Sequence, residues 1–561
     1  MGILKTGYQL LALSMENMVE HIIQRLRASP DEDLYRILTT LLYEAFQQTF
    51  LRLSSNAPAP AEETAMNVSL QKVSEILSSN SPNNSKYKEA FDRDFIVGKP
   101  TISQIIFKLG EWRARLQENL ALLPKTIQLE NYSRYLVEFE YQKYEDVEIP
   151  GQYLNLSKDS NNDFFMIDRF EPSVAIVKRH GSSFRRLGIR ATDGKVYFWL
   201  VQNPAARHSR REERMVQLLR FLSTVLERRK ETNRRNLTLS TPMIIPLSAH
   251  VRIVSDGACL ESLEELLEGH LSRGPTKQSS LEEIILWSRD ELIKRAESVT
   301  ASIPPVNSCA PLPVAVAAAA ASKRASPEMV NIKTDVFEEV SHTLVPPSIL
   351  STYYRTILAD CKDFWIWRQE FTQQYASSCF ITYILSIAHR LPHKVLIDAS
   401  NGKVFMSDLL PSTNHLGLVT LNEAVPFRLG PNVQSLIGPW GLEGPFVACL
   451  EALGEALDEG GLDFEVENYF ALAIRDELQS CSSVANPMAF SNNSNELDIL
   501  SKTIHNVDII LKRVQTMAAT KDRERYQELQ GPVNQAIVDL VSSATNPQKL
   551  CQMDPHWHPW L

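Results

Sequence analysis

Residues 382–411 have the sequence TYILSIAHRLPHKVLIDASNGKVFMSDLLP, and this stretch decides what fold the chain can have. It begins with an apolar run, passes through a polar loop, and continues into a second apolar run at residues 395–397. A turn that contains Gly402 and Lys403 then leads to Asp408. The pattern predicts a buried strand between two loops that carry the charged side chains.

The stretch resembles the catalytic and metal-binding loops of the phosphatidylinositol-3-kinase-related kinases. In that family the pattern is YILGLGDRHxxN, followed by an apolar strand, a short turn and IDFG. The matching scaffold positions in this chain are Tyr383, Ile384, Leu385, Arg390, residues 395–397, Gly402 and Lys403. The resemblance therefore covers the framework of both loops.

The residues that carry the chemistry of the family differ. His389 stands at the position of the catalytic Asp, Leu391 at that of the following His, and Lys394 at that of the metal-binding Asn. Of the second motif only Asp408 is retained, and two leucines follow it. The resemblance thus implies a kinase fold from which catalysis has been removed.

Phosphoryl transfer requires a carboxylate that positions the nucleophile and oxygen ligands that hold magnesium against the phosphates. Lys394 places a cation where a metal ligand is needed, and an imidazole at His389 without a metal site is a poor substitute base. Two interpretations stay open for His389 and Lys394, namely ordinary loop residues or a rescued catalytic site. We favour ordinary loop residues, and we predict no catalytic, cofactor-binding or metal-binding residues.

The composition indicates several globular domains, because 561 residues exceed what one core holds and 44% of them are hydrophobic. A net charge of -9 argues against a general nucleic-acid binder. The seven cysteines form no C-x-x-C pair, which fits a reducing compartment without structural zinc. We find no signal peptide and no apolar run long enough for a membrane span, and we expect a soluble intracellular protein.

The first part of the chain, residues 1–130, is predicted to be helical. Apolar residues recur at helical spacing in residues 11–26 and 34–46, and residues 102–123 form a further helical pattern around Trp112. Helical hairpins of this kind need neighbours that bury their faces. The family resemblance implies the end of a FAT solenoid and an FRB-like bundle, and the family proteins are several times longer than this chain.

Residues 131–255 are expected to form the amino-terminal kinase lobe. Strands are predicted from Tyr135 to Tyr141, at 173–179, at 187–191 and at 195–201, and the turn at 192–195 predicts a hairpin. Gln202 stands where the family has its phosphate-binding Lys. The family's phosphate loop falls at 180–183, where a single glycine favours a plain hairpin turn.

Residues 207–235 contain a basic cluster of Arg228, Arg229, Lys230, Arg234 and Arg235. One interpretation is a nuclear-localisation or nucleic-acid patch. The other is a solvated helix face, since glutamates are interleaved with the cluster. We favour the solvated face, because the acidic residues weaken the positive field.

Residues 256–480 are expected to form the carboxy-terminal lobe, with a Pro/Ala-rich surface insertion at about 302–327. The segment VPFRLGPN at 425–432 resembles the family's VPFRLTPN. Residues 481–528 are interpreted as a linker and a helix, and residues 529–561 resemble the FATC tail. The ending MDPHWHPWL resembles that of the TRRAP/Tra-type branch, and we expect its aromatic residues to pack against the lobe.

The predicted fold is therefore α+β, with a helical (FAT/FRB-like) part, a bilobed kinase-like domain and a FATC tail. The resemblance implies a non-catalytic scaffold of histone acetyltransferase complexes of the SAGA and NuA type, located in the nucleus. Its partners would be the subunits of those complexes and, mainly through the solenoid, transcription activators, with no direct nucleic acid and no membrane. The alternative is an active protein or lipid kinase of the same family.

Overall fold

A computed structural model of the chain provides the structure. It describes residues 84–97, 108, 111–112, 125–139, 147–151, 165–179, 182–202, 211–247, 251–257, 259–273, 281–301, 327–414, 417–420, 423–458, 464–485, 493–518, 534–553 and 557–561. The helical patterns predicted for residues 11–26 and 34–46 lie outside these residues, as does the insertion at 302–326. In the described part, no helix is long and apolar enough to cross a membrane.

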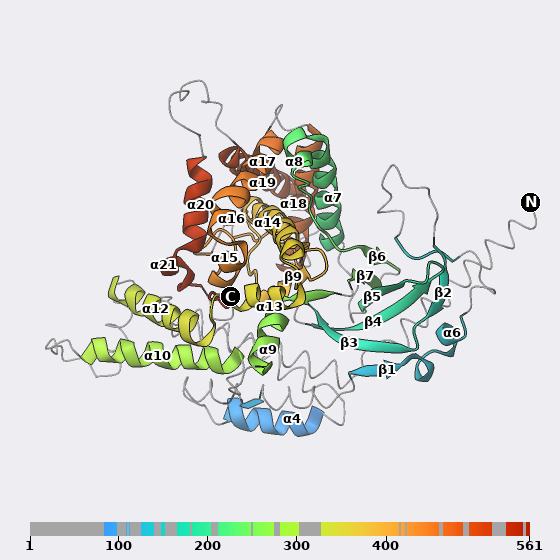
Figure 1. Ribbon diagram of the computed structural model, residues 1–561, viewed down its shortest axis with the longest axis horizontal. Helices are drawn as coiled ribbons and strands as arrows, with labels where there is room; N and C mark the ends of the chain where they lie inside the picture. Colours follow the sequence, from blue (N-terminus) through green and yellow to red (C-terminus); the bar gives the residue numbers. More distant parts are fainter. Residues whose placement is uncertain are drawn as a thin grey trace, which may run out of the picture.

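Seven strands of the described residues form an antiparallel sheet, which Figure 1 shows to the right of a larger helical lobe. The path runs β1-β3-β4-β5-β7-β6, and β2 pairs with β4 beside it. The strands are β1 (Thr126–Gln128), β2 (Ile167–Phe170), β3 (Ser173–Arg179), β4 (Ser182–Ala191), β5 (Val196–Gln202), β6 (Ile244–Pro246) and β7 (Arg252–Asp256). The sheet thus begins before residue 131, where the amino-terminal lobe was expected to start.

The β4–β5 hairpin confirms the predicted strands and turn. Residues from Arg185↔Val201 to Arg190↔Val196 pair in register, and the Ala191 N–H donates to the Lys195 carbonyl at 2.9 Å. The β3–β4 ladder likewise continues to Arg179↔Ser182, as a plain hairpin requires. Leu187, Ile189, Trp199 and Val201 alternate onto one face, where they form part of a buried apolar cluster.

The strand predicted from Tyr135 is wrong. Residues Arg134–Val137 form the short helix α6, after the 3-10 turn η2 (Leu129–Asn131). The hydroxyl of Ser133 accepts from the Leu136 N–H at 3.3 Å and so caps the helix. Leu136 of this helix and Phe139, two residues after it, belong to the buried apolar cluster of the sheet.

The helical lobe contains a small antiparallel sheet, β10-β9-β8, formed by Leu260–Ser262 (β8), Val395–Asp398 (β9) and Val404–Met406 (β10). Its helices before β9 are α7 (Arg211–Arg228), α8 (Lys230–Arg234), α9 (Leu263–Arg273), α10 (Leu281–Ala301), α12 (Pro327–Glu339), η5 (Val340–Leu344), α13 (Ile349–Ile357), α14 (Cys361–Ile384) and η6 (Pro392–Lys394). After β10 come α15 (Pro431–Ile437), α16 (Pro439–Gly441), η7 (Leu442–Phe446), α17 (Val447–Asp458), α18 (Phe464–Ala485), α19 (Asn493–Met517), α20 (Gln535–Thr545) and α21 (Pro547–Leu550). A separate short segment comprises α4 (Asn84–Phe91) and η1 (Asp92–Val97).

Helix α7 lies between β5 and β6 in the chain, yet its apolar face belongs to the core of the helical lobe. Its buried residues, including Leu218 and Leu222, cluster with α14 and α17 and not with the sheet. Figure 1 shows α7 beside α17 and α18. Arg211 pairs with Glu477 of α18 at 2.8 Å, which adds a polar tie. The basic cluster at the end of α7 includes Arg234 and Arg235, which pair with Glu231 at 3.2 and 2.6 Å.

The tail at the end of the sequence is buried in the helical lobe. Trp557, Trp560 and Leu561 are 1%, 4% and 0% exposed, which confirms that the tail aromatics pack against the lobe. The surface that these residues pack against includes Gly430, the residue before α15. A Cβ atom on Gly430 would lie 1.9 Å from the Leu561 backbone oxygen, so only glycine admits the tail at this distance.

We expect Gly430→Ala to lower the free energy of unfolding by about 2 kcal/mol or more, because either the tail or α15 must shift. The φ angle of Gly430 is -69°, so alanine causes no backbone strain and the effect is steric alone. Urea denaturation measures it. Gly269→Ala in α9 is the matched control, since a Cβ there meets nothing within 4 Å and helix propensity should raise stability by up to about 1 kcal/mol. Equal effects of the two substitutions would contradict the packing.

Candidate functional site

The loop that follows α14 carries the first group of predicted site residues. His389 has a positive φ of 53°, and its side chain is 81% exposed. Its backbone N–H donates to a carboxylate oxygen of Glu423 at 2.6 Å, while its imidazole Nδ1 lies 4.0 Å from the same oxygen. Leu391, in contrast, packs partly buried against the core of the lobe. The two side chains therefore lie in different surroundings, His389 in solvent and Leu391 against the core.

Arg390, between them, holds the loop to its neighbours. It is 2% exposed, and its guanidinium donates to the carbonyls of Ser407 at 2.8 Å and Asp408 at 2.6 Å. Burial lowers the pKa of Arg390 to about 10, with the nearby carboxylates of Asp408 and Glu423 acting against it. Arg390 thus stays charged near neutral pH and fixes the two loops against each other.

Lys394 and Asp408 are brought together by the β9–β10 hairpin. The ammonium of Lys394 is 2.5 Å from a carboxylate oxygen of Asp408, and the two side chains are 14% and 45% exposed. Asp408 has a positive φ of 54°, which an aspartate tolerates better than most residues. Burial raises the pKa of Asp408, but the Lys394 hydrogen bond and the charges of Lys394, Arg390 and His389 outweigh it, so this pKa is lowered overall.

These residues do not fit a magnesium ion. Magnesium needs octahedral oxygen ligands, and the carboxylate that could supply them already binds an ammonium of the same charge sign as the metal. Among the described residues, no group of three or more His, Cys, Asp or Glu side chains is placed to hold a metal.

Gln202 is the last residue of β5, an inner strand of the sheet. Its amide oxygen accepts from the guanidinium of Arg252 at 2.5 Å, and Arg252 also pairs with Glu212 of α7. Arg252 sits opposite Gln202 in the β5–β7 ladder and its side chain is 10% exposed. Arg252 from the neighbouring strand thus supplies a cation beside Gln202, and the carboxylate of Glu212 neutralises that cation.

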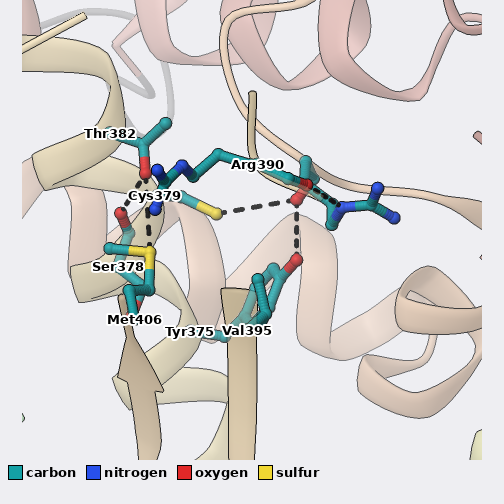
Figure 2. A pocket seen from close by; sticks show the side chains of 8 residues that line it. Tyr375, Ser378, Cys379, Thr382, Arg390, Val395 and Met406 are labelled. Carbon is teal, nitrogen blue, oxygen red and sulfur yellow. Dashed lines mark hydrogen bonds between the residues drawn. The ribbon is translucent and has the colours of Figure 1, made fainter. Parts of the chain in front are cut away.

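A small cavity lies behind the loop, between α14 and the β9–β10 hairpin. Figure 2 shows the side chains that line it, which come from Tyr375, Ser378, Cys379, Thr382, Arg390, Val395, Met406 and Arg428. The Tyr375 hydroxyl and the Cys379 thiol both reach the Arg428 carbonyl, at 2.8 and 3.9 Å. Burial raises the pKa of both groups, which keeps the thiol in its protonated, unreactive form.

Arg428 connects this loop to the tail. It is 2% exposed, and its guanidinium donates to the carbonyls of Trp557 and Arg390, the latter at 2.7 Å. It also lies 3.9 Å from the centre of the Trp557 ring. The segment around Arg428 resembles the family pattern, but neither Arg428 nor Arg252 was among the site residues predicted from the sequence. The available signal was an arginine inside an apolar motif, which must be paired when buried.

The fold and these residues together define a two-lobed protein of the phosphatidylinositol-kinase type. Family comparison agrees, because residues 201–483 match the phosphatidylinositol 3- and 4-kinase model and residues 531–561 match the FATC domain. The chain belongs to the phosphatidylinositol 3- and 4-kinase family and, across its whole length, is a homologue of the Tra1/TRRAP proteins.

The relatives are much longer than this chain. The "SAGA complex/NuA4 acetyltransferase complex subunit Tra1" of Schizosaccharomyces pombe is 35% identical over 100% of this chain, which spans 14% of that protein. The Saccharomyces cerevisiae subunit TRA1 is 34% identical with the same coverage. The human "Transformation/transcription domain-associated protein" is 30% identical over 85% of this chain and 12% of its own length.

A solved structure supports the fold. The FAT and kinase domain of CtTel1 superposes with a TM-score of 0.52 over 93% of this chain and 34% of that chain, at 17% identity. An identity this low bears on the fold alone. It confirms the α+β class, in which a kinase-type domain precedes a FATC tail.

The Lys394–Asp408 pair predicts an acid dependence of stability. A carboxyl with a lowered pKa in the folded state stabilises the fold above its unfolded pKa of about 4, and this contribution is lost as the pH falls through the folded value. We expect Asp408→Asn to lower the urea midpoint at pH 7, and the gap to the unaltered protein to close below about pH 4. A gap that stays constant from pH 7 to pH 3 would contradict the ion pair.

Proposed function

We propose that this chain is the kinase-like part of a non-catalytic scaffold subunit of SAGA/NuA4-type histone acetyltransferase complexes. The observation that carries the proposal is the 35% identity, over the whole chain, to a protein named as a subunit of both complexes. We extend to this chain its relatives' assembly role and the nuclear location that a chromatin-modifying complex implies. In the family, activators are contacted mainly by the solenoid, so we propose the subunits of these complexes as the main partners of this kinase-like part.

The absence of catalysis is the second part of the proposal. By the family pattern, Gln202, His389, Leu391 and Lys394 replace the residues that bind phosphate, act as base and hold metal. The contacts favour this assignment, since Lys394 is bonded to the one retained carboxylate, Asp408. We propose that the two-lobed fold is kept because its apolar cores and buried tail make a rigid docking body.

The domain division is proposed on the same basis. It comprises a helical region at 1–130, lobes at 131–255 and 256–480, a linker with a helix at 481–528, and a FATC tail at 529–561. The matches at 201–483 and 531–561 are compatible with it.

An active kinase of the same fold is the rival hypothesis, and nucleotide binding separates the two. We expect ATP with magnesium to raise the melting temperature of the chain by less than about 1 °C even at millimolar concentration, because Asp408 is paired with Lys394 and Arg252 with Glu212. Differential scanning fluorimetry measures this, with the Asp408→Ala variant alongside. A clear shift that Asp408→Ala abolishes would refute the non-catalytic assignment.

Assembly is tested in the full-length protein with a matched pair of substitutions. Asp408→Asn removes the retained carboxylate, and we expect co-purified acetyltransferase subunits to remain at the unaltered level. Arg428→Met removes the donor to the tail and to the Arg390 carbonyl, and we expect several-fold less co-purified complex, because buried carbonyls lose their partner. Quantitative mass spectrometry of affinity-purified complexes gives the readout. A scaffold role is wrong if Asp408→Asn disrupts assembly as strongly as Arg428→Met.

A further inference from the structure

One face of the large sheet carries polar side chains at both ends. Phe198, Leu200 and Gln202 alternate along β5, and opposite them in β7 lie Asp256, Val254 and Arg252. Directly paired residues of antiparallel strands project to the same face. The face thus has Arg252 and Gln202 at the α7 end, an apolar middle, and Asp256 at the end where β7 leaves the sheet.

At that second end Gly257 follows β7, and the chain continues into β8 of the helical lobe's small sheet. The connection therefore joins the two lobes. A backbone carbonyl in such a connection is a fixed hydrogen-bond acceptor between the lobes, and ligand sites often lie where two lobes or domains meet.

Arg186 of β4 already binds this carbonyl. Its Nη2 donates to the Gly257 carbonyl at 3.0 Å, and its Nε lies 2.9 Å from a carboxylate oxygen of Asp256. Its guanidinium carbon lies 4.0 Å from the centre of the Phe198 ring. The Arg186 and Asp256 side chains are 17% and 2% exposed, so the pair is held inside the protein.

We propose that Arg186 occupies the place of the purine base between the lobes, so that the chain fills its own nucleotide site. A guanidinium is planar, stacks on an aromatic ring and donates N–H groups in its plane, as the amino edge of adenine does. The Phe198 ring, the Gly257 carbonyl and the neighbouring Leu200 and Val254 form the surroundings that a purine needs. The proposal rests on the proposed function, since it explains the loss of nucleotide binding at the base and not only at the phosphates.

The pair is difficult to displace. Asp256 is almost fully buried, and a buried carboxylate without a partner is strongly destabilising. A base that displaced Arg186 would break the ion pair of that carboxylate, whose charge would also oppose the approach of phosphates. The strand supplies a contrast in Arg190, which pairs with Glu171 at 2.9 Å, but with side chains 33% and 26% exposed.

The test is to remove the pair together, as Arg186→Ala with Asp256→Asn, so that no buried charge is left alone. Adenosine is the probe, because it has the base without the phosphates and needs no metal. We expect the double variant to bind adenosine at least about tenfold more tightly than the unaltered chain, measured by calorimetry and by thermal shift. Arg190→Ala with Glu171→Gln removes a more exposed ion pair whose arginine lies on the same strand, and we expect this control to bind no better than the unaltered chain.

A milder variant, Arg186→Ser with Asp256→Asn, guards against misfolding. If both variants unfold without ligand, about 10 mM adenosine should restore their folding by mass action and should not affect the control. If the folded variants bind adenosine no more tightly than the unaltered chain, the proposal for Arg186 is overturned. The non-catalytic assignment is then unaffected. Binding of ATP with magnesium by the unaltered chain would instead refute that assignment.

Discussion

The buried guanidinium of Arg428 is the interaction on which the helical lobe depends. It donates to carbonyls of the tail and of the loop after α14, and the Arg428 carbonyl in turn accepts from the Tyr375 hydroxyl of α14. Burial lowers the pKa of Arg428 to about 10, which still leaves it charged at neutral pH. One cation thus orients two segments far apart in the chain, the loop after α14 and the tail, and their carbonyls are satisfied by a donor that cannot move without exposing both.

Other charged side chains are also paired within the chain. Lys394 pairs with Asp408, Arg252 with Glu212, and Arg186 with Asp256. A catalytic phosphotransfer site keeps its cations and carboxylates available for a ligand that brings the opposite charge. Here each of these charges meets a partner from the chain itself, so the ion pairs act between strands and loops. Ion pairs of this kind tie strands and loops together and leave these charged groups engaged within the chain.

Sequence patterns predicted the elements whose determinants are local. The β4–β5 hairpin followed from alternation and an Asp-Gly turn, and α19 lies within residues 481–528, where a helix was expected. Helix α6 was missed because Leu136, Val137 and Phe139 suit a strand equally well, and the Ser133 cap decides between the two. The substitution of Lys394 was visible, but its bond to Asp408, fourteen positions away, needs the β9–β10 turn. Arg186 and Gly257 are separated by 71 positions, and no local pattern joins them.

Helix α7 links the two lobes, because it lies among the strands of the sheet in sequence but packs in the helical lobe. The strands β5 and β7 are hydrogen-bonded neighbours, yet the segment between them leaves the sheet and buries its apolar face in the other lobe. A contiguous piece that ends after β7 would carry α7 with its core partners removed, and a piece that starts at β8 would lack the helix that covers α17 and α18. A cut of the chain between β7 and β8 would therefore not yield two lobes with intact cores.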